Sequence, residues 1–147
     1  MKRRDFLALL ASLPAGGALA AAERTAGGND GAPEGHTIVV EAERFTDFGG
    51  WVNDAQFMDQ MGSPFLLAHG MGKPVADATV DVKVPASGLY NVYAYTRNWT
   101  APWSAHAAGT FQVLVNGTAL PNELGTGSGD WRWQPAGAVG GMAAPKT

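Results

Sequence analysis

Apolar and polar residues alternate along three stretches of the chain, and this period of two predicts β-strands. In residues 78–84 the apolar side chains take every second position, with Thr, Asp and Lys between them, as in a half-buried strand. Residues 89–97 and 111–115 repeat the alternation. Residues 38–45 open with β-branched side chains and also read as a strand. Four strands are therefore expected before residue 116.

Turn-forming residues separate these stretches. Pro85-Ala86-Ser87-Gly88 predicts a tight turn, and Asn116-Gly117 is typical of a β-hairpin. No segment shows a helical period, so the sequence predicts an all-β protein with an antiparallel β-sandwich. With a further strand near residue 131, about five strands are expected, whereas a jelly roll has eight. We therefore expect a jelly-roll sandwich that lacks its closing strands.

The first twenty residues have the organisation of an export signal. Lys2, Arg3 and Arg4 form a positive start, and residues 6–13 are an apolar stretch too short to span a bilayer. Alanines stand at −3 and −1 from a cleavage point after residue 20. The arginine pair followed by Asp-Phe-Leu predicts a twin-arginine signal. An ordinary secretory signal is the alternative, and both indicate a periplasmic or secreted protein.

The remaining boundaries follow from changes in composition. The Ala, Gly, Asn, Asp and Pro content of residues 21–36 indicates a flexible linker. Residues 37–135 form the expected β-sandwich module, and the Ala/Gly/Pro-rich residues 136–147 are expected to be a disordered tail. The chain is thus one domain behind a signal and a linker.

Composition excludes several functions. The formal net charge of −3 and the lack of a basic patch argue against nucleic-acid binding. No apolar run is long enough for a membrane span. The chain has no cysteine, which excludes disulfides and thiolate metal sites. Its five tryptophans all lie between Trp51 and Trp133, and this concentration directs attention to aromatic chemistry.

Aromatic side chains suggest a sugar site, because the apolar C–H face of a pyranose stacks on an indole ring. We expect a carbohydrate to be held in one loop by Trp99 and Trp103, with three polar contacts from Arg97, Asn98 and His106. Trp51 is expected in the core instead. Trp131 and Trp133 share one strand face, where core packing and ligand contact remain alternatives.

Two glutamates and a histidine are the remaining candidates for a metal or catalytic site. Glu41 and Glu43 would share one face of an extended strand, where two carboxylates favour a hard cation or a basic partner; an exposed acidic face is the alternative. His69 has no second His or Cys close to it in the sequence, so a structural role is expected rather than a metal-binding one. No nucleophile or metalloprotease motif is visible, and Gly70-Met71-Gly72 lacks the rest of a dinucleotide fingerprint. No catalytic residue is therefore assigned.

Three motifs follow one another along the expected strands: Val-Glu-Ala-Glu at 40–43, Val-Pro-Ala-Ser-Gly-Leu-Tyr-Asn-Val at 84–92, and Phe-Gln-Val-Leu-Val-Asn-Gly at 111–117. Their order resembles the galactose-binding-like modules attached to bacterial carbohydrate-active enzymes, including carbohydrate-binding families 6 and 35. The resemblance implies a glycan-binding β-sandwich. It also implies a structural calcium held by Glu41 and Glu43 together with an acidic residue of a last strand.

A second group of segments covers more of the chain, namely residues 50–57, 61–72, 74–78, 97–99 and 130–134. With the motifs above, it is similar to the N-terminal module of large exported bacterial proteins known as FAD-dependent oxidoreductases or xanthan-lyase-like proteins. The likeness extends over about residues 37–135. In those relatives further strands and a catalytic region follow, whereas this chain departs from their pattern after Gln134.

Three hypotheses result. The first is a non-catalytic, carbohydrate-binding-like module that holds a polysaccharide or glycan near an enzyme. The second is the N-terminal fragment of a larger exported FAD-dependent oxidoreductase or polysaccharide-degrading enzyme, whose catalytic domain is missing from this chain. The third is a structural module that docks onto a catalytic partner and binds no sugar.

Overall fold

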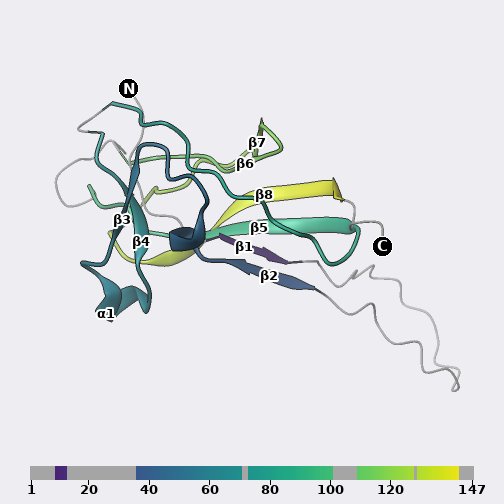
Figure 1. Ribbon diagram of the computed structural model, residues 1–147, viewed down its shortest axis with the longest axis horizontal. Helices are drawn as coiled ribbons and strands as arrows, with labels where there is room; N and C mark the ends of the chain where they lie inside the picture. Colours follow the sequence, from purple (N-terminus) through teal and green to yellow (C-terminus); the bar gives the residue numbers. More distant parts are fainter. Residues whose placement is uncertain (1–8, 13–35, 71–72, 101–108, 128, 143–147) are drawn as a thin grey trace, which may run out of the picture.

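The computed structural model describes residues 9–12, 36–70, 73–100, 109–127 and 129–142 (Figure 1). Within these residues the protein is mostly β, as the sequence predicted, with little helix. The strands are β1 (Leu9–Ser12), β2 (Thr37–Val40), β3 (Trp51–Asp54), β4 (Phe65–Ala68), β5 (Gly88–Thr96), β6 (Leu114–Val115), β7 (Thr118–Ala119) and β8 (Arg132–Met142). The two helical elements are a 3-10 turn, η1 (Ala42–Arg44), and α1 (Met58–Met61).

Among the residues that the structure describes, all strand pairs are antiparallel, and they form three sheets. The largest has the order β2-β1-β5-β8, while β3 pairs with β4 and β6 with β7. Figure 1 shows the large sheet to one side of the β3–β4 pair, with the β6–β7 hairpin above it. Over the described part of the chain these sheets do not close into a complete sandwich or jelly roll.

The strand β5 organises the core. Its alternate residues Tyr90, Val92, Ala94 and Thr96 are at most 3% exposed, and the residues between them are half-buried. The main cluster joins Val92 and Ala94 to Ala136 of β8 and to apolar residues of segment 111–124. The alternation predicted for residues 89–97 is therefore confirmed, because one face of β5 covers this core.

The strand β4 is buried along its whole length. Phe65 and Leu67 pack with Phe57 and two tryptophans, whereas Leu66 packs with Ala42 and Phe45. Two separate clusters thus cover its two faces. A strand buried on both faces lacks the apolar–polar alternation that reveals a half-buried strand in a sequence.

The Asn116-Gly117 hairpin is confirmed. Asn116 has φ 49° and Gly117 has φ 78°, and the two residues connect β6 to β7. Positive φ at both central residues is the type I′ geometry that matches the twist of a two-residue hairpin. Asparagine and glycine tolerate it better than other residues, so this turn was readable in the sequence.

Residues 41–45 differ from the expected strand. β2 ends at Val40, and η1 follows, with Ala42 and Phe45 both buried. This burial has a spacing of three, which a turn of 3-10 helix satisfies and a strand does not. The prediction that Glu41 and Glu43 share one face of an extended strand is therefore wrong.

Residues 78–84 also differ from prediction, because no strand ladder forms along them. Asp47 and Thr79 make an isolated antiparallel bridge, and Val82 is 40% exposed. Alternation alone does not make a strand when no neighbouring segment pairs with its backbone. Residues 112–113 likewise lie outside strands, between the Phe111–Leu124 bridge and β6.

The expected tail differs at residues 136–142, which belong to β8. β8 pairs with β5 from the Thr96–Arg132 pair to the Gly88–Met142 pair, with two register irregularities. Gly137 in this strand has φ 145°, a conformation that glycine adopts readily. The sequence did not predict this strand, because alanine and glycine have low β-propensity. Pairing with β5 determines the conformation of residues 136–142 instead.

Residues 9–12 of the predicted signal form β1, an inner strand of the large sheet. None of the helices in the described residues is long and apolar enough to cross a membrane.

Candidate functional site

Six aromatic side chains gather where the large sheet meets β4 and α1. We call this group the aromatic cluster; it comprises Phe57, Phe65, Tyr95, Trp99, Trp131 and Trp133. Each ring contacts at least one other, with centroids 5.2–5.9 Å apart in the closest pairs. Phe65 is fully buried, and Trp99 and Trp131 are partly buried against it. The inner part of the cluster is therefore a packed core.

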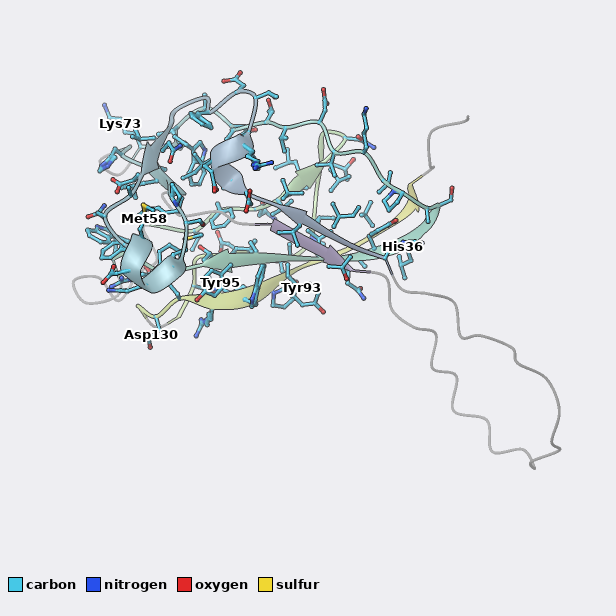
Figure 2. The ribbon with its side chains drawn as sticks, turned by 60° about the horizontal axis from the view of Figure 1, so that its bottom comes forward. His36, Met58, Lys73, Tyr93, Tyr95 and Asp130 are labelled. Atoms are coloured by element: carbon cyan, nitrogen blue, oxygen red, sulfur yellow. The ribbon has the colours of Figure 1, made fainter. Side chains whose placement is uncertain are left out.

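The outer part of the cluster is accessible. Tyr95 of β5 is directly opposite Trp133 of β8, and their ring centroids are 5.2 Å apart at a tilt of 45°. Trp131, two residues away, stacks on Tyr95 at 5.7 Å with 19° between the ring planes. Trp133 itself is 47% exposed. In Figure 2, Tyr93 and Tyr95 lie along the same side of β5. This face of the sheet therefore presents the Trp133 indole to solvent, with the Tyr95 ring beside it.

A groove of about 500 Å³ borders Trp133. It is lined by Pro121, Asn122, Glu123, Leu124, Thr126, Arg132, Trp133, Gln134 and Pro135. Arg132 donates a hydrogen bond of 2.6 Å to the Thr126 carbonyl, and Glu123 accepts one of 2.6 Å from the Thr110 hydroxyl. The groove thus combines one exposed indole with a cation, a carboxylate and an amide held in place by the fold.

The structure brings two of the predicted sugar contacts together. The guanidinium carbon of Arg97 lies 5.8 Å from the centroid of Trp99 and 4.7 Å from that of Phe57. The Arg97 side chain also donates to Gln60 at 3.5 Å. Trp99 is 5.3 Å from Phe57 and is partly buried in the cluster. Arg97 and Trp99 therefore contribute cation–π and packing energy within the chain.

Asn98 is 4% exposed, and its side chain makes hydrogen bonds within the protein. Its amide nitrogen donates to the Gly127 carbonyl at 3.1 Å, while its oxygen accepts from the backbone and the hydroxyl of Thr100. These bonds tie segment 98–100 to segment 125–127. The other two predicted contacts, Trp103 and His106, lie outside the described residues. Their roles stay predictions.

Glu41 and Glu43 are not brought together as a pair. Glu41 precedes η1 and forms an ion pair of 2.9 Å with Arg44, whereas Glu43 lies within the turn. The residues that the structure describes contain no group of three or more His, Cys, Asp and Glu side chains suited to a metal ion. The calcium site stays a prediction from the sequence resemblance.

Trp51 belongs to the core, as predicted. It lies edge-on to Phe111 at 5.9 Å and packs against two of the three core clusters. His69 is exposed and directly follows β4.

The pairing of Tyr95 with Trp133 was missed from the sequence. Two signals were present: Tyr93 and Tyr95 alternate on one strand, and Trp131 and Trp133 alternate on another. A spacing of two puts each pair on one face of its strand, but the register that sets Tyr95 opposite Trp133 is a tertiary property. Without it, the two aromatic faces could not be joined into one site.

No protein-family model, curated protein or solved structure matches the chain. A functional assignment therefore rests on the aromatic cluster, the groove and the sequence motifs.

Proposed function

We propose that this chain is an exported, non-catalytic carbohydrate-binding module, built on an antiparallel β-sandwich of the galactose-binding-like, jelly-roll kind. One observation carries the proposal: Trp133 is 47% exposed, rests on Tyr95, and borders a groove with fixed polar groups. The module would hold a polysaccharide near an associated enzyme. Its motifs at residues 40–43, 84–92 and 111–117 support the same assignment.

The chemistry of the groove suits a sugar ring. The C–H face of a pyranose is apolar and covers an indole, which removes apolar surface from water. Its equatorial hydroxyls then reach donors and acceptors at the rim, which Arg132, Glu123 and Asn122 supply. Such a site combines an aromatic platform with a few polar groups that fix orientation.

This proposal makes Trp133 the principal stacking residue instead of Trp99. Trp99 already packs against Phe57 and lies beneath the Arg97 guanidinium. The contacts predicted for Trp103 and His106 stay part of the proposal on the sequence alone.

The sequence resemblance over about residues 37–135 supports a second candidate. Val39, Leu89 and Val52 are 67%, 47% and 47% exposed, so each leaves apolar surface that a following domain could cover. The chain would then be the N-terminal part of a larger exported FAD-dependent oxidoreductase or polysaccharide-degrading enzyme. An immunoblot of the source cells, with an antibody against residues 37–127, tests this candidate. A band several times larger than 15.3 kDa supports it, and a band at or below 15.3 kDa refutes it.

The sugar proposal is tested by affinity electrophoresis of the full chain in gels containing a panel of polysaccharides. At least one polysaccharide should retard the protein, and Trp133→Ala should abolish the retardation. Val52→Ala is the matched control, because Val52 is equally exposed but lies on the separate β3–β4 pair. Retardation that persists in Trp133→Ala would refute the assigned site. A panel without any retardation would refute the function.

A further inference from the structure

A strand from the predicted export signal occupies an inner position of the large sheet. β1 lies between β2 and β5 and pairs antiparallel with both. Figure 1 shows it as a short purple arrow between these two strands. In the described part of the chain, β2 has no other strand neighbour. β1 therefore connects β2 to the rest of the sheet.

The position of β1 conflicts with its predicted fate. Cleavage after Ala20 would separate residues 9–12 from the module covalently. If the strand then left, β2 and β5 would lie roughly 10 Å apart, two strand spacings, with backbone N–H and C=O groups facing the interval. Unpaired backbone groups of this kind are a template for another strand.

We propose that the interval between β2 and β5 is a strand-acceptor site, which the chain's own leader fills before cleavage and an extended apolar segment of a partner polypeptide fills afterwards. The inference rests on the proposed export signal, because cleavage of the leader is what makes this strand exchangeable. Binding of this kind adds a strand to a sheet: the main chain supplies affinity, and alternate side chains supply specificity.

The neighbouring strands define the chemistry of the incoming segment. Val92 and Ala94 of β5 are 3% and 0% exposed, and the β1 positions opposite them hold Ala11 and Leu9. The same two positions are opposite Ile38 and Val40 of β2, which are half-buried. Residues directly opposite one another in an antiparallel pair share a face of the sheet. The partner segment must therefore be apolar at these two alternate positions.

The intervening positions tolerate polar residues. They hold Leu10 and Ser12, opposite Tyr93 and Asn91 of β5, which are both half-buried. On the β2 side they face Val39, which is 67% exposed, and the exposed Thr37. A four-residue segment of the type apolar–any–apolar–polar, antiparallel to both neighbours, fits the site.

The rest of the sheet can persist while β1 is exchanged. β5 pairs with β8 at eight register positions, but with β1 at four. Ala136 of β8 and Val92 and Ala94 of β5 belong to one core cluster, so the β5–β8 ladder is also held by side-chain packing. β1 is thus a short strand between β5, which β8 holds in place, and the edge strand β2. This position favours the replacement of β1 by another strand.

The test uses the full chain with a protease recognition sequence inserted after Gly28. The chain is folded first, and the protease then cuts it at this site. The leader fragment should stay bound and co-elute in gel filtration. A fluorescent peptide of residues 6–15, added in excess, should then replace it and form a 1:1 complex. The same peptide with Leu10→Pro should bind at least about tenfold more weakly, because proline removes a ladder N–H. The Leu10→Val peptide, which keeps that N–H, should bind like the parent.

Several results would overturn the proposal. These are loss of the fragment on cleavage with no binding of either peptide, equal binding of the proline peptide, or a dimer of two chains instead of a 1:1 complex. If the insertion prevents folding, hydrogen exchange on the uninterrupted chain replaces the test. Within segment 91–94 every second amide faces β1 and the others face β8. Leu10→Pro should then raise the exchange rates of the amides that face β1 at least about tenfold, and unchanged rates would refute the site. Both tests use purified protein, so failure of the export proposal leaves their outcomes unaffected.

Discussion

Tyr95 and Trp133 are directly opposite each other in the β5–β8 ladder, with ring centroids 5.2 Å apart. This pair divides the aromatic cluster into two parts. Trp131, Phe57 and Phe65 pack on the inner side, and the indole of Trp133 meets solvent on the outer side. Stability and ligand binding are therefore expected to depend on different tryptophans of the same strand.

The first prediction separates those two roles. Trp131→Ala removes a ring that contacts Tyr95, Phe57 and Phe65, and should lower the free energy of unfolding by about 3 kcal/mol. Trp133→Ala should lower it by about 1 kcal/mol or less, because much of that ring is already in water. Urea unfolding of both full-length variants measures the difference. Equal losses would contradict the division.

A second prediction concerns two glycines with positive φ. Gly62, with φ 86°, ends α1, and a Cβ there would meet no atom within 4 Å. Gly62→Ala should therefore cost about 1 kcal/mol, the strain of the left-handed conformation alone. Gly49, with φ 54°, has the carbonyl oxygens of Ala76 and Asp77 where a Cβ would lie. Gly49→Ala should cost clearly more, and thermal unfolding of both variants compares them.

The third prediction tests the buried amide of Gln134, which borders the groove. Its oxygen accepts from the Gly125 N–H at 3.1 Å, and its nitrogen donates to the Thr126 carbonyl at 3.3 Å. Gln134→Glu turns that donor into an oxygen facing a carbonyl oxygen, so the variant should lose about 1–3 kcal/mol. Gln60→Glu is the control, because Gln60 is exposed and its oxygen accepts from Arg97. Denaturant midpoints that fall equally in both variants would contradict the structural role.

The fourth prediction concerns export. An Arg3→Lys, Arg4→Lys double variant keeps the positive charge but removes the arginine pair, so it should accumulate in the cytoplasm with its leader uncut. Lys2→Gln, which keeps the pair, should be exported. Cell fractionation and immunoblotting measure both. Normal export of the double variant would instead support an ordinary secretory signal.

Some features of this fold were readable in the sequence and others were not. The alternation of residues 89–97 predicted β5, and Asn116-Gly117 predicted the hairpin, because both signals are local. β4 was missed because burial on both faces removes the alternation. Residues 136–142 were missed because glycine and alanine have low β-propensity, and pairing with β5 gives them their conformation.

The candidate site was predicted only in part. Arg97 and Trp99, two of the predicted contacts, lie 5.8 Å apart (guanidinium carbon to ring centroid), and their role in sugar binding stays a prediction. The groove beside Trp133 depends on the register of β8 against β5 and on segment 121–126 lying along it. Neither is encoded by local spacing, so the sequence directed attention to the neighbouring loop instead.

The central claim is that Trp133 stacks on a bound sugar, and calorimetric titration tests it most directly. The full chain is titrated with an oligosaccharide of the polysaccharide that retards it most in affinity gels. We expect saturable binding by the parent chain and by Val52→Ala. Trp133→Ala should weaken binding at least about tenfold, and Trp133→Phe should retain part of the affinity because a smaller ring still stacks. Binding of unchanged affinity in Trp133→Ala would contradict the account.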